Sequence, residues 1–184
     1  MRIISGQLRG RKLFSISGSR TRPTADKVRE SIFNILSARI ENTVVLDLFA
    51  GTGALGIEAA SRGALGVVCI DDNPIAVRAI QKNVSAFAIE NSVKIIKWNI
   101  SRNLNCIRSP QPIYNLVFMD PPYGRGLVKK ALKNLHRSQS VKQGATLIVE
   151  HTEQEPIPDG LPFLDITDQR KYGKTLVSFL TYMV

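Results

Sequence analysis

Five apolar runs of strand length recur along the middle of the chain, and turn residues bound each of them. These runs are VVLDLF (44–49), GVVCID (66–71), VKIIKW (93–98), NLVFMD (115–120) and ATLIVE (145–150). Segments compatible with helix separate them, most clearly residues 74–88 and 127–137. Near-continuous apolar strands that alternate with helices are typical of a parallel sheet covered on both faces. The pattern therefore predicts an α/β fold.

The two ends of the chain follow other patterns. Residues 163–184 hold two strand-like runs around Gly173 with no helix between them, which predicts an antiparallel hairpin at one edge of the sheet. Near the start, RIISG and KLFSI flank a Gly/Arg-rich turn and predict a small β-hairpin, and SGSRTRP (17–23) is typical of a linker. Thr24 is expected to cap a helix that runs to about residue 39. We therefore expect a seven-stranded, mostly parallel sheet within residues 24–184 and a basic extension over residues 1–23.

Composition narrows the class of protein. Of the 184 residues, 43% are hydrophobic and 22% are charged, as in an ordinary globular domain. No apolar run approaches the roughly 20 residues that a membrane-spanning helix needs, and the start shows no secretory signal. Cys69 lies within an apolar strand, where we expect a reduced and buried thiol. These features predict a cytoplasmic protein without membrane contact.

The distribution of charge indicates a polyanionic partner. The net charge is +10 at pH 7, and residues 1–29 alone carry eight Lys or Arg against a single acid. The other 155 residues are more balanced, with 17 basic and 14 acidic side chains. Such an asymmetric basic segment is typical of nucleic-acid binding, although a solvated basic arm has the same composition.

A glycine-rich loop follows the first buried strand. Gly51, Gly53 and Gly56 in LDLFAGTGALGIEAA match G-x-G-x-x-G at the point where a strand ends and a helix begins. This context is typical of nucleotide-binding loops, because the glycines let a ligand approach the N-terminus of the helix. The pattern serves both dinucleotides and S-adenosylmethionine, and a glycine turn can also serve only to pack a strand against a helix.

Polar side chains at the strand ends distinguish between these ligands. Asp47 precedes Gly51 by four residues, where its carboxylate would repel a pyrophosphate but attract the amino group and sulfonium of S-adenosylmethionine. Asp71 ends the second strand and is placed to accept hydrogen bonds from both ribose hydroxyls. Asn99 follows the third strand, where it would lie beside an adenine or simply form a turn. These positions favour S-adenosylmethionine over a dinucleotide.

The fourth strand delivers Asp120 to the same edge of the sheet, followed by Pro121, Pro122 and Tyr123. This order suits recognition of an exocyclic nucleobase amine, whose lone pair is delocalised into the ring. Asp120 and a backbone carbonyl of the Pro-Pro segment can each accept one N–H, which favours a pyramidal nitrogen aimed at the methyl group. The prolines stiffen the turn, and Tyr123 offers a ring on which a flipped base can stack.

These motifs resemble class I methyltransferases that act on nucleobase amines and have a Rossmann-like fold, and more closely the RsmD-type bacterial methyltransferases. The similar segments span nearly the whole chain: IISGQLRGRKL, RPTADKVRESIFNIL, LDLFAGTGALGIEAASRGA, FMDPPY and YGKT. The resemblance implies methyl transfer from S-adenosylmethionine to N2 of a guanine in 16S rRNA, position 966 in the usual rRNA numbering. It also implies that residues 120–123 bind the target amine. The candidate cofactor-binding residues are Asp47, Phe49, Gly51, Gly53, Asp71 and Asn99.

The partner implied by the resemblance is 16S rRNA within an assembled or assembling 30S subunit, and we expect a monomer that needs no metal. The candidate phosphate contacts are Arg2, Arg9, Arg11, Lys12, Arg22, Arg29 and Lys129. Three alternatives remain: a DNA adenine-N6 methyltransferase, an NAD-dependent oxidoreductase, and a catalytically silent RNA-binding protein. Too few residues lie outside the sheet-forming region to form the separate target-recognition domain of a DNA methyltransferase. The carboxylate of Asp47 argues against an NAD-dependent oxidoreductase, because it would repel the pyrophosphate.

Overall fold

The computed structural model describes residues 1–16 and 23–184. Its helices are α1 (Pro23–Leu36), α2 (Ala54–Ser61), α3 (Pro74–Phe87) and α4 (Leu127–Ser138), with short 3₁₀ turns at η1 (Ser37–Arg39) and η2 (Asn105–Ile107). The strands are β1 (Val44–Leu48), β2 (Gly66–Asp71), β3 (Val93–Lys97), β4 (Tyr114–Met119), β5 (Val141–His151), β6 (Leu164–Tyr172) and β7 (Thr175–Tyr182). Within this described part of the chain, no helix has the length and apolarity needed to span a membrane.

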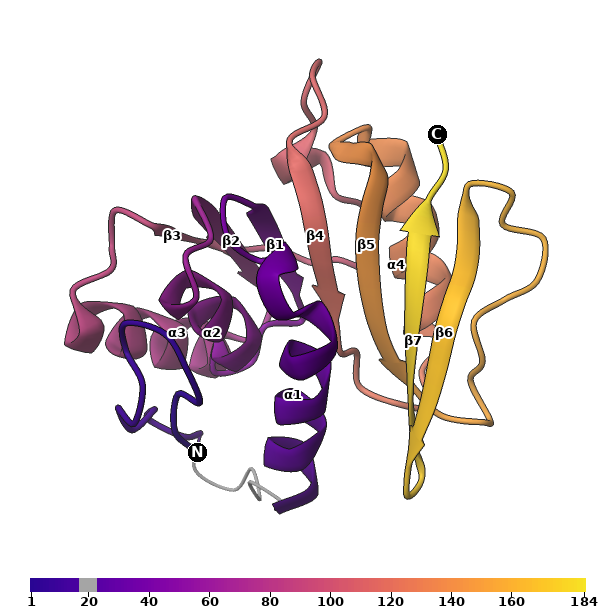
Figure 1. Ribbon diagram of the computed structural model, residues 1–184. Helices are drawn as coiled ribbons and strands as arrows, with labels where there is room; N and C mark the ends of the chain where they lie inside the picture. Colours follow the sequence, from indigo (N-terminus) through magenta and orange to yellow (C-terminus); the bar gives the residue numbers. More distant parts are fainter. Residues whose placement is uncertain (17–22) are drawn as a thin grey trace.

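The seven strands form one sheet in the order β3-β2-β1-β4-β5-β7-β6 (Figure 1). The first five strands of that order are parallel, and β7 runs antiparallel between β5 and β6. The predicted parallel sheet with a C-terminal antiparallel hairpin is therefore confirmed. Gly173 has a φ of +62° in the turn between β6 and β7, a conformation that glycine adopts without the steric cost of a Cβ. This strand order brings the carboxyl ends of β1, β2 and β4 to one edge.

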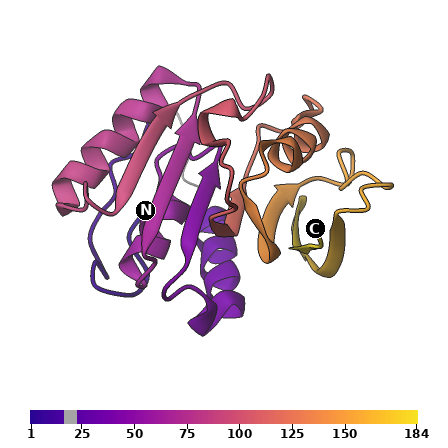
Figure 2. The ribbon, with the colours of Figure 1, turned by 90° about the horizontal axis from the view of Figure 1, so that it is seen from above.

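Helices cover both faces of the sheet (Figure 2), and each face has its own layer of buried apolar side chains. On one face α1, α2 and α3 bury side chains such as Phe33, Ile57 and Ile80, and on the other α4 buries side chains such as Leu132. The Phe33 ring of α1 lies 5.5 Å, centroid to centroid, from the Phe118 ring of β4. Because these side chains leave water together, the helices are held at fixed positions on the sheet.

Helix α1 begins one residue before the cap that the sequence predicts. Thr24 lies inside the helix, and Pro23 is its first residue. Proline suits that position because the first N–H groups of a helix have no partner within it, and because the φ of proline is already helical. The helix ends at Leu36, and η1 extends the turn to Arg39, the predicted end.

The N-terminal segment, residues 1–16, belongs to the main core. Where the sequence predicts a small β-hairpin, the two arms pair through an antiparallel bridge between Arg2 and Lys12, with the N–H of Ile3 donating to the carbonyl oxygen of Arg11 at 3.0 Å. Ile3, Leu8 and Leu13 are buried in the same apolar layer as α1, α2 and α3. Contacts with the helices therefore hold this segment in place together with the pairing of its two arms.

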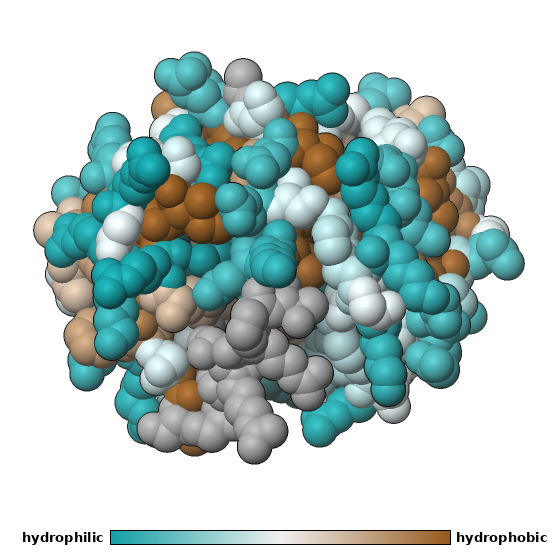
Figure 3. Space-filling model, turned by 60° about the horizontal axis from the view of Figure 1, so that its bottom comes forward, coloured by the Kyte–Doolittle hydropathy of each residue, from teal (hydrophilic) through white to brown (hydrophobic). Residues whose placement is uncertain are grey.

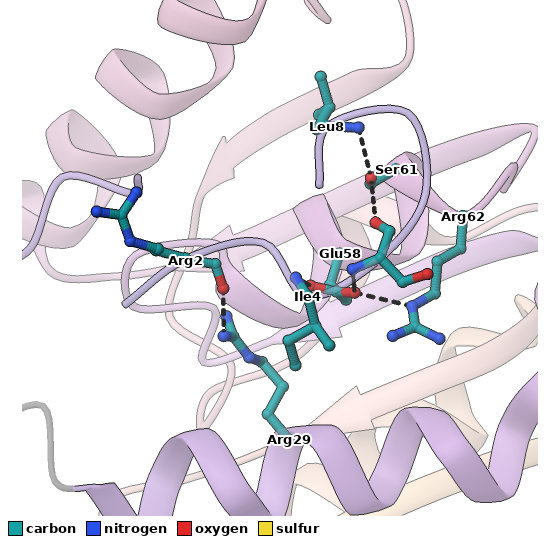
Figure 4. A network of polar contacts seen from close by, with 8 residues as sticks. Arg2, Ile4, Leu8, Arg29, Glu58, Ser61 and Arg62 are labelled. Carbon is teal, nitrogen blue, oxygen red and sulfur yellow. Dashed lines mark hydrogen bonds and ion pairs between the residues drawn. The ribbon is translucent and has the colours of Figure 1, made fainter. Parts of the chain in front are cut away.

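The buried carboxylate of Glu58 ties the N-terminal segment to α2 (Figure 4). It accepts hydrogen bonds from the backbone N–H groups of Ile4 at 2.8 Å and Ser5 at 3.0 Å. Nε of Arg62 donates a third bond at 2.8 Å and balances the charge. The Ser61 hydroxyl donates to the carbonyl oxygen of Ser5 at 2.6 Å. The segment is thus fixed by side chains that lie more than fifty residues away in sequence.

Candidate active site

The glycine loop between β1 and α2 departs from ordinary backbone geometry. Phe49, Gly51 and Gly53 have φ values of +60°, +57° and +77°, and the value is costly for Phe49 because it carries a Cβ. A Cβ at Gly56 would lie 2.8 Å from a sulfur atom of β2 and 3.1 Å from a carboxylate oxygen of Asp47. Glycine at position 56 therefore lets α2 pack tightly on β1 and β2, and the loop turns sharply at the edge of the sheet.

Two aspartates support this loop. The carboxylate of Asp71, at the end of β2, accepts hydrogen bonds from the N–H groups of Gly51 and Asn73, both at 2.9 Å. The carboxylate of Asp47, in β1, accepts one from the N–H of Gly56 at 2.8 Å. A carboxylate has about four lone-pair sites, so each aspartate keeps acceptor capacity for a ligand. These bonds fix both carboxylates beside the glycine loop.

Burial makes Asp47 a weak acid. Its side chain is 2% exposed, and the loss of hydration raises the pKa of Asp47 to about 7. The N–H of Gly56 acts against this rise in pKa, and the negative charges of Asp120 and Asp71 add to it. A positive group near Asp47 would favour the ionised form, so this part of the site suits a cationic ligand.

Residues 120–123 turn over the same edge from the end of β4. Pro121 is buried, whereas Pro122 and Tyr123 are exposed. Tyr123 keeps 43% of its surface accessible and forms a side-chain hydrogen bond with Thr175. Burial of the rest of the side chain raises the pKa of Tyr123 to about 12, with a further contribution from the charge of Asp120. The ring is therefore neutral, held at its hydroxyl and partly accessible.

The turn between β6 and β7 connects this segment to α1. Thr175, which begins β7, contacts Tyr123, and the hydroxyl of Tyr172 at the end of β6 hydrogen-bonds with the hydroxyl of Ser31. The YGKT segment therefore forms the predicted turn and also contacts two sides of the candidate site.

Two adjoining hollows lie at this edge of the sheet, which points down in Figure 1. The first hollow, about 270 Å³, is bounded by Asp47, the glycine loop, Asp120 and Glu150. The second hollow, about 510 Å³, shares Phe49 and Asp120 with the first and extends to residues 121–123. Hydrophilic side chains cover most of the molecule as seen from this end (Figure 3). Residues 120–123, called the amine motif below because the sequence predicts that they bind an amine, thus border one continuous space with the glycine loop.

A third hollow, about 300 Å³, lies at the ends of β2 and β3, between Asp72, Trp98 and Asn99. Asp72 also lines the second hollow, so the two adjoin. The side-chain oxygen of Asn99 accepts hydrogen bonds from the Ser101 hydroxyl at 2.7 Å and the Arg102 N–H at 3.2 Å. Because that oxygen is engaged in a turn, the amide nitrogen of Asn99 is the group left to face a ligand.

Asp120 and Glu150 form an acidic pair at the ends of β4 and β5. Met119 pairs with Val149 in the parallel ladder, so the next residues of the two strands lie side by side. Asp120 is accessible from the hollow, yet the protein walls displace enough water to raise the pKa of Asp120 to about 6. Burial, and then the charge of Asp120, raise the pKa of Glu150 well above its ordinary value.

Arg29 of α1 lines the first hollow and is 5% exposed. Its Nη2 donates to the carbonyl oxygen of Arg2 at 2.6 Å (Figure 4). The same nitrogen lies 3.3 Å from a carboxylate oxygen of Asp26. Within the residues that the structure describes, its Nε and Nη1 have no hydrogen-bond partner. Burial lowers the pKa of Arg29, as expected for a guanidinium that has lost water.

This placement corrects one sequence-based expectation. The sequence groups Arg29 with the phosphate contacts, but a side chain buried beneath the N-terminal segment does not present its charge to RNA. Arg29 nevertheless lines the first hollow, where its positive charge would favour an anionic group of a ligand. Arg29 therefore belongs with the candidate cofactor-binding residues.

The other candidate phosphate contacts lie on the surface. The exposed members are Arg2, Arg9, Arg11, Lys12 and Lys129. Arg11 is partly engaged, because its guanidinium lies 4.6 Å from the centroid of the Phe87 ring. Lys129 lies in the first turn of α4, which packs on the other face of the sheet but starts shortly after the amine motif. Arg22 lies outside the described residues. The structure thus spreads these cations over both layers.

Glu155 supports the site and was missed by the sequence reasoning. Its carboxylate accepts hydrogen bonds from the N–H groups of Gly124 at 2.8 Å and Val128 at 3.3 Å. It therefore fixes the turn after Tyr123 to the first turn of α4, where a negative charge is also favoured by the helix dipole. Glu155 lies in an irregular segment between β5 and β6 that carries no motif, so no signal in the sequence points to it.

Comparison with known proteins finds relatives over the whole chain. Residues 1–181 match the family described as "Conserved hypothetical protein 95". The chain is 33% identical to YlbH of Bacillus subtilis (strain 168), which is named provisionally as an rRNA methyltransferase, over 97% of both chains. It is 36% identical to "Ribosomal RNA small subunit methyltransferase D" of Escherichia coli (strain K12), covering 86% of this chain and 78% of that protein.

A solved structure agrees with these sequence matches. The Escherichia coli protein yhhF, named provisionally as a methyltransferase, aligns with a TM-score of 0.88 and 31% sequence identity. The alignment covers 100% of this chain and 98% of that one. The similarity therefore includes the N-terminal segment as well as the sheet and its loops.

Proposed function

We propose, from the premise that this chain belongs to the RsmD-type family of rRNA methyltransferases, that it transfers a methyl group from S-adenosylmethionine to N2 of a guanine in 16S rRNA. One observation carries this proposal: the glycine loop and Asp120 border the same continuous space at the carboxyl edge of the sheet. A ligand bound along the loop would lie next to a base held by residues 120–123.

The lining residues fit S-adenosylmethionine. The positive charge of Arg29 beside the first hollow suits its carboxylate, and the buried carboxylate of Asp47 suits its amino group. Asp71 lines the second hollow, where it would accept hydrogen bonds from the ribose, and Asn99 lines the third hollow, which would take the adenine. Phe49 lies between the first two hollows and would contact the middle of the molecule. When bound, the cofactor supplies an electrophilic methyl group.

The residues of the amine motif would orient the nucleophile. Asp120 accepts one N–H of the guanine amine, and the rigid backbone at Pro121 offers a carbonyl for the other. With a pKa of about 6, Asp120 is mostly ionised at neutral pH and can stabilise positive charge that develops on nitrogen. Tyr123, held by Thr175, stacks on the base. Catalysis then rests mainly on alignment of the amine with the methyl group.

The RNA would approach over the basic surface. Residues 1–23 act as the RNA-binding extension, with Arg2, Arg9 and Lys12 contacting phosphates, and Lys129 adds a contact beyond the amine motif. We propose that the enzyme acts as a monomer on 16S rRNA in an assembled or assembling 30S subunit. A DNA adenine-N6 methyltransferase would use the same amine motif, but the relatives at 33–37% identity that carry a substrate in their names are named for rRNA.

Replacing Asp120 by Ala tests the proposed role. We expect the affinity for S-adenosylhomocysteine, measured by isothermal titration calorimetry, to change little. Incorporation of labelled methyl groups into purified 30S particles should fall by about 10²-fold or more, because a transition-state contact is lost. Asp165→Ala, at an exposed position of β6, is the matched control and should leave both unchanged. Unaltered turnover in Asp120→Ala, or methylation of duplex DNA but not of 30S particles, would contradict the proposal. Mass spectrometry locates the modified nucleotide.

A further inference from the structure

Glu150 has no role in the reaction described so far, yet it borders the space that the target base must enter. It follows Val149 in β5 and lies beside Asp120, because Met119 and Val149 are paired. Two residues earlier, Phe118 and Ile148 are buried in the apolar layer of α1. Side chains alternate along a strand, so Asp120 and Glu150 project toward that same face. Both carboxylates accordingly line the first hollow.

The position of Glu150 is fixed while its carboxylate is free to bind. Its strand is paired on both sides, with β4 through Val149 and with β7 through Glu150 and Val177. Among the residues that the structure describes, none donates a hydrogen bond to the carboxylate of Asp120 or Glu150. Acceptors held on rigid strands and left without donors in a hollow are suited to N–H groups of a ligand.

The edge of guanine that carries the target amine presents such N–H groups in a row. Its N1–H lies next to the N2 amine, whereas N1 of adenine carries a lone pair and no hydrogen. Asp120 accounts for one N–H of the amine, and Glu150 is the neighbouring acceptor. We propose that Glu150 accepts a hydrogen bond from N1–H of the target guanine and so selects guanine over bases that lack this hydrogen. This inference rests on the function proposed above.

The electrostatics of the pair agree with this role. Burial and the charge of Asp120 raise the pKa of Glu150, as expected of two neighbouring carboxylates without donors. A guanine edge would donate to both carboxylates and favour their ionised forms. A base with a lone pair at N1 would either face an ionised Glu150 oxygen or require Glu150 to keep its proton, and in both cases it would lose the charge-assisted bond that N1–H of guanine makes. Tyr123 lines the second hollow, which shares Asp120 with the first, so its ring borders the space that the base would enter.

A nucleotide substitution tests this inference directly. 2,6-Diaminopurine keeps the 2-amino group of guanine but has a lone pair at N1. In reconstituted 30S particles that carry it at the target position, we expect methylation of the 2-amine by the unaltered enzyme to fall by on the order of 10²-fold or more relative to guanine. Equal rates on guanine and diaminopurine would overturn the inference. Failure to methylate the unmodified particle would refute the proposed function itself.

The variant Glu150→Gln makes the test reciprocal. The glutamine amide can donate to N1 of diaminopurine, so the ratio of the diaminopurine rate to the guanine rate should rise by at least about tenfold. Glu153→Gln, at an exposed position that pairs with Lys171, is the matched control and should keep the original preference. Binding of S-adenosylhomocysteine reports whether the variants are folded. If Glu150→Gln binds this ligand and loses activity equally on both substrates, Glu150 does not read N1.

Discussion

Replacing Glu58 by Gln should loosen the N-terminal segment without creating a cavity. Three donors converge on the buried carboxylate: the backbone N–H groups of Ile4 and Ser5, and Nε of Arg62. Glutamine has nearly the same shape, but one of its two acceptor oxygens becomes an NH₂ group that donates. At least one of the three donors then faces another donor. Because Met1 and Ile16 of this segment line the first hollow, the change should also reach the cofactor site.

The free energy lost in Glu58→Gln depends on how the three donors are divided between the two carboxylate oxygens. Oε2 of Glu58 binds Ile4, whereas Oε1 binds both Ser5 and Arg62. The less costly orientation of glutamine places NH₂ against Ile4, which leaves one buried donor unpaired at about 1–3 kcal/mol. The two remaining bonds become neutral at the acceptor and lose about half of their strength. Together these changes predict a loss of about 2–4 kcal/mol in the free energy that holds the segment down.

Hydrogen exchange of the backbone amides measures this loss locally. In Glu58→Gln, amides of residues 3–8 should exchange at least about 25-fold faster, since each 1.4 kcal/mol corresponds to a factor of ten. Affinity for S-adenosylhomocysteine should fall as well, because part of the wall of the first hollow is loosened. Glu90→Gln, at an exposed turn after α3, is the control. If Ile4 and Ser5 stay as protected as in the unaltered protein, the carboxylate does not hold the segment.

Two further predictions concern backbone packing and pH. Gly6→Ala should lower the free energy of unfolding in urea by about 2 kcal/mol or more, because the added Cβ would lie 1.9 Å from the carbonyl oxygen of Ser61. Gly10 has a similar φ but open space around it, so Gly10→Ala should lower that free energy by only about 1–2 kcal/mol. If both variants lose the same free energy of unfolding, the N-terminal segment moves to relieve the contact with Ser61. The pKa of Asp47, about 7 in the folded protein and near 4 when unfolded, means that the folded state holds the extra proton. The stability that this proton contributes is complete below about pH 4 and is lost as the pH rises through 7. The free energy of unfolding should therefore fall less between pH 5 and 8 in Asp47→Asn than in the unaltered protein. If the fall is the same in both proteins, groups other than Asp47 cause it.

The sheet could be predicted from the sequence because its signals are local. The central strands are near-continuous apolar runs, and their ends coincide with the turn residues that the sequence shows. Once the strands are known to be parallel, their carboxyl ends share one edge, which is why Asp47, Asp71 and Asp120 come together. The start of α1 differed by one residue because Pro23 and Thr24 are both helix-start signals, and the proline took the first helical position.

The anchoring of the N-terminal segment could not be predicted, because it depends on contacts between distant residues. Nothing near Glu58 in sequence indicates that it accepts hydrogen bonds from Ile4 and Ser5. The burial of Arg29 did have a signal. It lies three and four residues before Ile32 and Phe33, on the apolar face of α1, and that helical spacing is a better guide than its place in a basic stretch.

The site separates two kinds of charge that the whole-chain net charge of +10 conceals. Cations such as Arg9 and Lys12 lie on the outside, where, under the proposed function, they would attract an RNA backbone. In the wall of the first hollow the carboxylates of Asp47, Asp120 and Glu150 outnumber the guanidinium of Arg29, so that, when ionised, they disfavour phosphates, accept N–H groups and stabilise a cationic ligand. An RNA strand drawn to the surface would therefore be kept out of the hollow by its own backbone, and a base turned away from that backbone would be the part able to enter. The charge pattern thus favours base flipping before any specific contact is made.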